Sequence, residues 1–116
     1  MLLNMYKAKI SNARVTATEL HYEGSITIDE KLIKTVDILP GERVQVVNLN
    51  NGNRFETYVI VGKAGSGEIC LNGPAAHKGK IGDSVHIIAY ALMEPKEAKT
   101  FKPKLIALHE HNRIKN

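Results

Sequence analysis

The chain has 116 residues, 43% hydrophobic and 24% charged, a balance that excludes an intrinsically disordered protein and allows one modest globular core. No apolar run approaches the roughly 20 residues of a membrane helix, and MLLNMYKAK lacks the pattern of a secretory signal. The net charge of +4 is spread among acidic residues, so it does not by itself indicate a nucleic-acid partner. With a single cysteine, Cys70, no internal disulfide can form, and we expect one cytoplasmic domain.

The first half of the chain predicts a strand followed by a helix. Residues 6–20 are rich in β-branched residues and predict one long strand that could bend. From Asp29, the run DEKLIKTVDI places apolar residues at helical spacing behind an acidic start, which predicts a helix. The Pro-Gly pair within residues 39–42 is expected to end that helix.

The second half predicts mostly short strands. Asn51-Gly52 suits the positive φ values of a type I′ turn, so residues 43–62 predict a β-hairpin. A turn at residues 64–68 leads into the short strand ICLNG, and SVHIIAYALM (84–93) predicts a strand buried on both faces. A short helix in KEAK, a last strand over residues 104–109 and a frayed polar end complete the chain.

Six or so strands with one or two small helices make the expected fold mainly β. A closed barrel is favoured for so many strands in so few residues, because closure leaves no long exposed edge. An open sheet with a helix on one side is the alternative.

Neither Cys70 nor the four histidines that follow His21 have the spacing of metal ligands, and HEH near the end is not a zinc motif. The stretch GKAGSG contains the letters of a phosphate loop in the wrong order, and strands rather than a helix follow it. The sequence therefore predicts neither a metal site nor a phosphate loop.

The pair Gly24-Ser25 stands where the first long strand should end. Most Gly-Ser pairs are turns, but a hydroxyl that follows a glycine can attack the glycine carbonyl and convert the amide into an ester. Glycine suits this reaction because it has no Cβ to shield its carbonyl and it tolerates unusual backbone conformations. Elimination from the ester would release ammonia and leave a pyruvoyl ketone in place of the serine.

Three separated motifs give this pair more weight. VTATELHYEGSITID, NGNRFETYVI and NGPAAHKGKIGD resemble the pyruvoyl-dependent aspartate 1-decarboxylase family, over about residues 1–93. The resemblance implies a six-stranded double-psi β-barrel with one or two short helices. It also implies a homotetramer with active sites between adjacent subunits, which converts L-aspartate to β-alanine and carbon dioxide for pantothenate synthesis.

The resemblance further implies that the chain cleaves itself between Gly24 and Ser25. Residues 1–24 would become the small chain, and residues 25–116 the large chain, with Ser25 turned into the pyruvoyl group. That ketone would accept the electrons left by loss of carbon dioxide, as pyridoxal phosphate does in other decarboxylases. Neither pyridoxal phosphate nor a metal is therefore expected.

The remaining roles are also implied by position in the family's motifs. Tyr58 matches the proton donor of the decarboxylation. Thr57 matches the hydroxyl that polarises the Gly24 carbonyl during processing, and it also lies near bound substrate. Arg54 and Lys9 match the cations that hold the substrate carboxylates. Asn72 is assigned to processing, and the further substrate-contacting positions are Tyr22, Gly73, Pro74 and Ala75.

Two positions depart from the family's pattern, and one strand poses a geometric question. Ser11-Asn12 stands where members often carry His-Arg, and Pro74 replaces a common alanine and removes one backbone donor. Strict alternation would place Thr57 on the strand face opposite Tyr58. Either both faces serve active sites, which contacts between subunits would allow and which we favour, or the strand is irregular there.

Two other classes of protein fit parts of the sequence. A small basic β-barrel that binds nucleic acid would explain the pI near 9.2, but the chain has no Trp, two Phe and four Tyr for base stacking. A purely structural assembly module would use Gly24-Ser25 only as a turn. The resemblance favours the decarboxylase, with L-aspartate as its partner and no nucleic acid or membrane.

Overall fold

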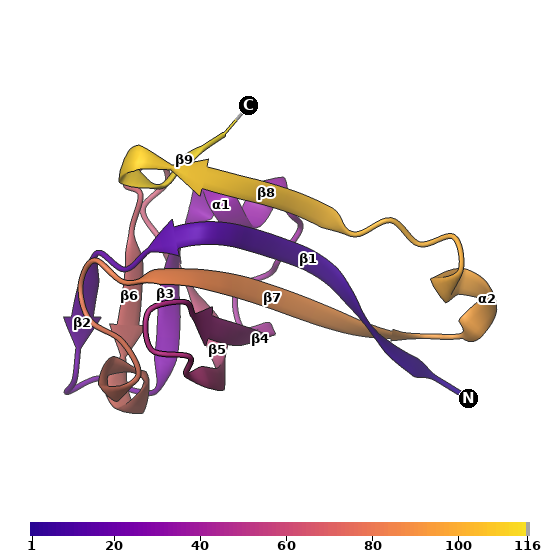
Figure 1. Ribbon diagram of the computed structural model, residues 1–116, viewed down its shortest axis with the longest axis horizontal. Coiled ribbons are helices and arrows are strands. Elements are labelled where there is room, and N and C mark those ends of the chain that lie inside the picture. Colours follow the sequence, from indigo (N-terminus) through magenta and orange to yellow (C-terminus); the bar gives the residue numbers. More distant parts are fainter. Residues whose placement is uncertain (116) are drawn as a thin grey trace.

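The computed structural model describes residues 1–115 and consists mainly of strands (Figure 1). The strands are β1 (Leu3–Arg14), β2 (Ala17–Glu19), β3 (Ser25–Asp29), β4 (Arg43–Asn48), β5 (Arg54–Gly62), β6 (Ile69–Asn72), β7 (Ser84–Met93), β8 (Lys104–His109) and β9 (Arg113–Ile114). The helices are α1 (Glu30–Thr35) and α2 (Pro95–Ala98), with the 3-10 turns η1 (Gly73–His77) and η2 (Glu110–Asn112). The predicted mainly β architecture with two short α-helices is confirmed. No helix in this part of the chain is long and apolar enough to cross a membrane.

The strands pair in the order β2-β6-β3-β5-β4-β7-β1-β8-β9. β1 lies between β7 and β8, and two residues after β1 ends the chain continues as β2, which pairs with β6 at the other end of this order. The predicted long strand over residues 6–20 is therefore two strands joined by a bend at Val15 and Thr16. This one segment connects both ends of the strand order.

The core is formed by side chains that alternate along the strands. On β1 and β7 alternate residues are buried, whereas β6 is buried throughout its length. One helix, α1, adds Leu32 and Ile33 to this core. β3, whose two ends carry the buried polar residues Ser25 and Asp29, lies beside this core.

The helix α1 begins and ends at hydrogen-bonded caps. The Asp29 side chain accepts from Lys31 N at 2.8 Å, as the predicted helix start requires. At the other end, the N–H groups of Asp37 and Ile38 donate back to Lys34 O and Ile33 O, with Asp37 at a φ of 57°. The prediction that residues 39–42 end the helix is wrong, because this cap closes it at Thr35.

The hairpin between β4 and β5 is confirmed, but its predicted turn type is wrong. Asn48 N donates to Asn53 O at 2.8 Å and Gly52 N donates to Asn48 O at 2.9 Å, which leaves a four-residue loop. Of the loop residues, only Gly52 has a positive φ, at 77°. A type I′ turn would require a positive φ at Asn51 as well.

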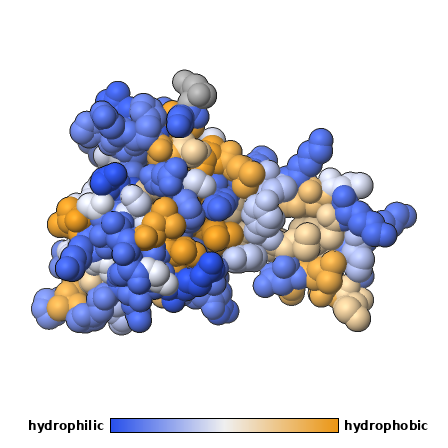
Figure 2. Space-filling view, in the orientation of Figure 1, coloured by the Kyte–Doolittle hydropathy of each residue, from blue (hydrophilic) through white to orange (hydrophobic). Residues whose placement is uncertain are grey.

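β1 and β7 extend beyond the other strands as an arm, with the N-terminus and α2 near its tip (Figure 1). β7 was predicted to be buried on both faces, which is wrong: Tyr90 is 37% and Leu92 64% exposed, because no second layer covers that face of the arm. Apolar residues gather at this projecting end in Figure 2. The exposed large apolar side chains of β1, β7, β8 and the segments beside them are Met1, Leu2, Leu3, Tyr6, Tyr90, Leu92, Phe101 and Leu105.

The C-terminal segment is docked rather than frayed as predicted. Asn112 is only 3% exposed; its Nδ2 donates to Arg14 O and to Gly67 O, both at 2.8 Å, and its Oδ1 accepts from Arg14 N at 2.7 Å. Lys115 N donates to Ala107 O at 2.7 Å. Only Asn116 of the predicted frayed end lies outside the described residues. The polar sequence at this end of the chain gave no sign that the Asn112 side chain is buried and makes three hydrogen bonds to the backbone.

Candidate functional site

Ser25 is the first residue of β3, and its side chain is fully buried although serine is polar. β3 lies between β6 and β5: Ser25 pairs with Asn72 on β6, and Ile26 pairs with Val59 on β5. Continuing the parallel register one residue back places Ser25 beside Tyr58. Strand pairing alone therefore brings three of the predicted site residues together at one end of β3.

The Ser25 hydroxyl has two hydrogen-bond partners. Its Oγ donates to the Glu23 carbonyl oxygen at 2.9 Å and accepts from Asn72 Nδ2 at 3.0 Å. The same Nδ2 donates to Thr27 Oγ1 at 2.9 Å, and Asn72 Oδ1 accepts from Cys70 Sγ at 3.2 Å. Burial raises the pKa of the Cys70 thiol, so the thiol keeps the proton that this bond requires. The predicted processing residue Asn72 thus contacts Ser25 directly.

Gly73 holds the loop in front of the Gly24–Ser25 bond by close backbone contact. Its φ is +60°, and a Cβ here would lie 2.5 Å from Tyr22 O and 2.8 Å from Gly24 N. Pro74 follows in the first turn of η1, and its Cδ would lie 3.3 Å from a Cβ on Gly24. Position 73 therefore requires glycine both for its left-handed backbone and for the approach of this loop.

A cleft of about 370 Å³ opens beside the Gly24–Ser25 bond. The predicted site residues that line it are Gly24, Thr57, Tyr58, Pro74 and Ala75. The structure adds Phe55, Glu56 and Lys78 to this lining. Tyr22, which is 52% exposed, is not part of the lining and contributes its backbone carbonyl to the contact with Gly73.

Tyr58 is tied to the loop that contains the Gly24–Ser25 bond. Its hydroxyl donates to Glu23 Oε1 at 2.7 Å. This hydrogen bond, followed by burial and by the negative charge of Glu23, raises the pKa of Tyr58 above its ordinary value. The phenol therefore carries its proton at neutral pH.

The strand β5 borders this cleft with consecutive residues from both of its faces. Thr57 and Tyr58 are both half-buried and line the same cleft. Tyr58 is the last residue that pairs with β4, and Val59 is the first that pairs with β3, and both pairings run in unbroken register. The single chain therefore shows no irregularity at this point, and the use of both faces by active sites between subunits stays a prediction.

Lys9 and Arg54 lie together, but in a different cleft. This second cleft, of about 430 Å³, also contains Tyr6, Ser11, Ile88, Tyr90 and Leu105 on the arm. Arg54 Nη1 donates to Gln45 Oε1 at 3.2 Å. Among residues 1–115, no carboxylate lies within 4.0 Å of the charged nitrogens of Lys9 or Arg54. Within one chain, Lys9 and Arg54, which were predicted to bind the substrate carboxylates, therefore do not line the cleft beside the Gly24–Ser25 bond.

Of the two departures Ser11 and Asn12, only Ser11 lines this second cleft. Asn12, with a φ of 60°, donates its backbone N–H to His86 Nδ1 at 3.2 Å. Burial, followed by the charge of Lys9, lowers the pKa of His86, so its imidazole is neutral at pH 7. A neutral histidine on β7 therefore lies near the predicted clamps.

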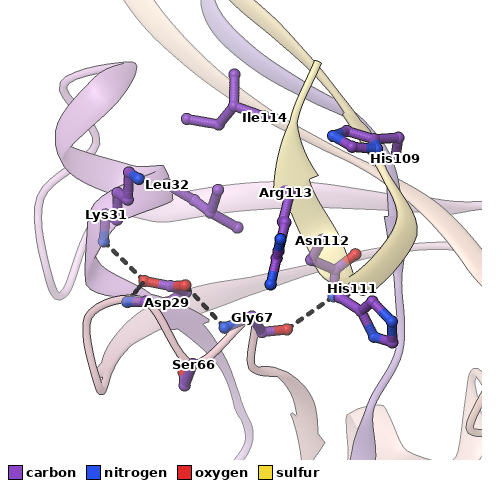
Figure 3. A pocket seen from close by; sticks show the side chains of 11 residues that line it. Asp29, Lys31, Leu32, Ser66, Gly67, His109, His111, Asn112, Arg113 and Ile114 are labelled. Atoms are coloured by element: carbon purple, nitrogen blue, oxygen red, sulfur yellow. Dashed lines mark hydrogen bonds between the residues drawn. The ribbon is translucent and has the colours of Figure 1, made fainter.

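A cavity of about 730 Å³, larger than the cleft beside the Gly24–Ser25 bond, lies at the opposite end of β3 and contains none of the predicted site residues (Figure 3). Asp29 in its wall is saturated by backbone donors, from Lys31 N, Gly65 N and Gly67 N at 2.8 to 2.9 Å. Histidines also line it, yet no group of three His, Cys, Asp or Glu side chains in residues 1–115 is placed to hold a metal. Size alone therefore does not identify the site.

Comparisons with known proteins agree with this arrangement of residues. The sequence model of the family described as Aspartate decarboxylase matches residues 1–115. The chain is 59% identical to the Aspartate 1-decarboxylase of Carboxydothermus hydrogenoformans, over 98% of this chain and 90% of the relative. It is 54% identical to that of Thermoanaerobacter pseudethanolicus, over 97% and 96% of the two chains.

This chain belongs to the aspartate decarboxylase family. Among solved structures, the rationally designed mkDPBB_sym_86 protein, a double-psi β-barrel design, matches with a TM-score of 0.50 at 15% identity. The match covers 66% of this chain and 90% of the design, and at this identity it concerns the fold alone. Membership in the aspartate decarboxylase family supports the enzyme over the nucleic-acid barrel and over the structural module.

Reasoning from the sequence missed three residues that lie near Ser25. Glu23 binds Tyr58, and its position next to the Gly24-Ser25 pair was the one available signal. Cys70 and Thr27 bind Asn72 from two strands. Contacts between strands far apart in sequence leave no local pattern that would have identified them.

Proposed function

We propose that this chain cleaves its own Gly24–Ser25 bond and then decarboxylates L-aspartate to β-alanine and carbon dioxide, the step that supplies β-alanine for pantothenate. The observation that carries the proposal is the buried Ser25 hydroxyl, which is hydrogen-bonded to Asn72 and adjoins a cleft lined by Gly24, Thr57 and Tyr58. A serine in a simple turn has no need of burial or of a side-chain donor. The products are a small chain of residues 1–24 and a large chain that starts at position 25.

The cleavage needs only groups that the chain supplies, together with water. Ser25 Oγ adds to the Gly24 carbonyl carbon, and the C–N bond breaks to give an ester and a free amine. Elimination then breaks the Ser25 Cβ–Oγ bond, leaves the oxygen on the Gly24 carboxylate and forms dehydroalanine. Water hydrolyses its imine tautomer to the ketone and releases ammonia. Thr57, which lines the same cleft as Gly24, is assigned to polarise the carbonyl.

The same cleft then serves the decarboxylation. A pyruvoyl ketone at position 25 supplies an electron sink for the carbanion that loss of carbon dioxide produces. Tyr58 borders this position, and its raised pKa keeps it protonated, as a donor to that carbanion must be. Tyr22, Gly73, Pro74 and Ala75 shape the loop and cleft around the substrate.

Lys9 and Arg54 are assigned to the substrate carboxylates of a neighbouring copy of the chain. They lie in a separate cleft among exposed apolar side chains of the arm, and no carboxylate among residues 1–115 pairs with either cation. An exposed apolar arm of this kind favours burial against another subunit. We therefore propose a homotetramer in which one subunit provides the Ser25 cleft and its neighbour provides the two cations.

Three further features belong to the same proposal. The sheet, whose two ends are linked through residues 3–19, forms a closed double-psi β-barrel with six barrel strands. The enzyme works in the cytoplasm, in keeping with its single, unpaired Cys70. It uses no pyridoxal phosphate and no metal.

Denaturing mass spectrometry tests the cleavage with a control inside the same chain. The purified wild type should give two fragments divided after Gly24, and Ser25→Ala should give one intact chain without decarboxylase activity. Gly65-Ser66 is a second Gly-Ser pair, but it lies in an exposed turn, so Ser66→Ala should be cut normally. An active wild type that is one unbroken chain would overturn the proposal.

Mixing inactive variants tests the shared site. Arg54→Ala and Tyr58→Phe should each be cut but should lose about a hundredfold or more in turnover. If each site draws Arg54 from one subunit and Tyr58 from its neighbour, coexpression of the two variants should restore part of the activity. No recovery in verified mixed tetramers would place both residues in the same subunit's site.

A further inference from the structure

Four polar side chains form a square on one face of the β3–β6 pair. Ser25 is paired with Asn72, and Thr27 is paired with Cys70, in the antiparallel register of the two strands. Residues two apart on a strand point to the same face, so each strand contributes two members. Asn72 contacts all three of the others.

We propose that Cys70 and Thr27 are positioning residues for self-cleavage: they fix the orientation of the Asn72 amide, which in turn holds the Ser25 hydroxyl toward Gly24. The inference rests on the proposed self-cleavage. Among the described residues, neither Cys70 nor Thr27 is hydrogen-bonded to the Gly24 carbonyl; both act through Asn72.

The side-chain amide of Asn72 can adopt two orientations that exchange its oxygen and nitrogen, and the neighbouring side chains select one of them. A side-chain amide has an acceptor oxygen on one side and two N–H donors on the other. Cys70 presents a thiol proton to Oδ1 at 3.2 Å, and the two Nδ2 protons then meet the Ser25 and Thr27 oxygens at 3.0 and 2.9 Å. Each polar side-chain atom of the square has at least one hydrogen-bond partner in this orientation.

The reversed orientation would break these matches. Oδ1 would then face the Ser25 oxygen, whose proton is already donated to the Glu23 carbonyl at 2.9 Å, and Nδ2 would face the Cys70 thiol. Burial raises the pKa of that thiol and so keeps it a donor, which would set donor against donor. A buried donor without an acceptor is unfavourable, so the thiol disfavours the reversed amide.

The orientation matters for the chemistry of Ser25. The Ser25 hydroxyl donates its proton in a hydrogen bond to the Glu23 carbonyl, and one of its two lone pairs accepts from Asn72 Nδ2. The hydroxyl oxygen therefore has one lone pair left for attack. Both bonds restrict rotation of the side chain, as a near-attack geometry requires. Loss of the Cys70 donor would let the amide, and with it the hydroxyl, sample other orientations.

The test follows cleavage over time after cell-free synthesis, by denaturing mass spectrometry of the full chain. Cys70→Ala removes the donor and should slow cleavage about tenfold. Cys70→Ser keeps a donor at this position and should restore a rate near the wild type. Leu71→Val is the matched control, because Leu71 is a fully buried β6 neighbour outside this hydrogen-bonded square; it should destabilise the chain without slowing the cut.

Thr27 has its own pair of variants. Thr27→Val removes the acceptor at nearly constant shape and should slow cleavage, whereas Thr27→Ser should restore it. Equal rates for Cys70→Ala and the wild type, or equal slowing in Cys70→Ala and Cys70→Ser, would overturn the inference. An uncut wild type would instead refute the proposed self-cleavage itself, so the two failures are distinguishable.

Discussion

The two ends of β3 each carry a buried polar side chain, and the two are satisfied in different ways. The Ser25 hydroxyl is hydrogen-bonded to the Glu23 carbonyl and to the side chain of Asn72. Asp29, about 13 Å further along the strand, is bound by three backbone N–H groups, and the loop that supplies two of them is held in turn by Asn112.

The difference separates an end suited to reaction from an end suited to anchoring. The partners of Ser25 are one side chain and the backbone of the loop that contains the scissile bond. The backbone donors of the Asp29 cap are fixed by the start of α1 and by the docked C-terminal segment (Figure 3). Changes at one end should therefore affect cleavage, and changes at the other should affect mainly unfolding.

Gly73→Ala should have the largest effect on the Ser25 end. The left-handed backbone alone costs about 1–2 kcal/mol for a residue with a side chain, and the new Cβ would collide with Tyr22 O and Gly24 N. We expect loss of cleavage together with a marked drop in stability. The measurements are denaturing mass spectrometry and urea unfolding at fixed chain concentration.

Gly52→Ala is the matched control for this variant. Gly52 also has a positive φ, of 77°, but nothing lies within 4 Å of the position of its Cβ. It should lose about 1–2 kcal/mol and still be cut. If both variants were cut equally well, the close approach at Gly73 would have no part in positioning the scissile bond.

Asp29→Ala should have the next largest effect, at the other end of the strand. Three backbone donors would lose their charged acceptor, and the bond from Gly67 N is buried, so we expect a loss of about 3 kcal/mol. Unfolding is best measured in the Ser25→Ala background, which keeps every chain uncut. With Ser25 present, and well below the unfolding temperature, cleavage should continue.

The neighbouring variant Glu30→Gln serves as its control. Glu30 is the first residue of α1 and pairs only with Lys34, one turn away, so its change should stay within about 0.5 kcal/mol. An equal loss in both variants would mean that the Asp29 cap has no special share in stability.

The same contrast explains what the sequence could predict. Strands, hairpin and helix positions follow from local patterns, and they agree with the structure from the arm to β8. One error was local, because a left-handed Asp37 cap ends α1 before the Pro-Gly pair is reached. The other errors, the exposed face of β7 and the buried Asn112, concern burial between distant elements. These depend on which elements pack together, which one sequence does not reveal.

The site shows the same division. The structure brings Gly24, Thr57, Tyr58 and the loop after Asn72 together in one cleft, and it places Lys9 and Arg54 in another. The roles assigned to these residues stay predictions. The partners that orient them, such as Glu23 and Cys70, lie on other strands and became visible only through strand register.

Asn112→Ala sharpens the anchoring half of the comparison with a smaller effect. Three hydrogen bonds to backbone groups of Arg14 and Gly67 would be lost, which should cost about 2 kcal/mol. Lys115→Ala, with an exposed side chain in the same segment, should change little. Urea unfolding in the Ser25→Ala background measures both, and equal stabilities would show that the C-terminal segment does not anchor the sheet.

Glu23→Gln should have the smallest effect, and it concerns only the reactive end. The hydrogen bond to Glu23 and the negative charge of that residue raise the pKa of Tyr58 above its ordinary value of 10.0, so removing the charge should lower this pKa. A raised pKa stabilises the folded chain below the unfolded value, and this contribution is lost as pH rises through the folded value. At pH 7 this contribution is present in full, so the variant should be slightly less stable than the wild type there, and the wild type should lose more stability than the variant above pH 10.

The titration of Tyr58 is isolated by subtracting the tyrosinate absorbance of Tyr58→Phe from that of the intact chain, both in the Ser25→Ala background. The same subtraction with Glu23→Gln gives the shifted value. Glu56→Gln is a suitable control, because Glu56 lines the same cleft but pairs with Arg43 rather than with Tyr58. If Glu23→Gln and Glu56→Gln left the Tyr58 pKa equally high, burial rather than Glu23 would hold the proton, and the loop before the scissile bond would have no influence on the proposed proton donor.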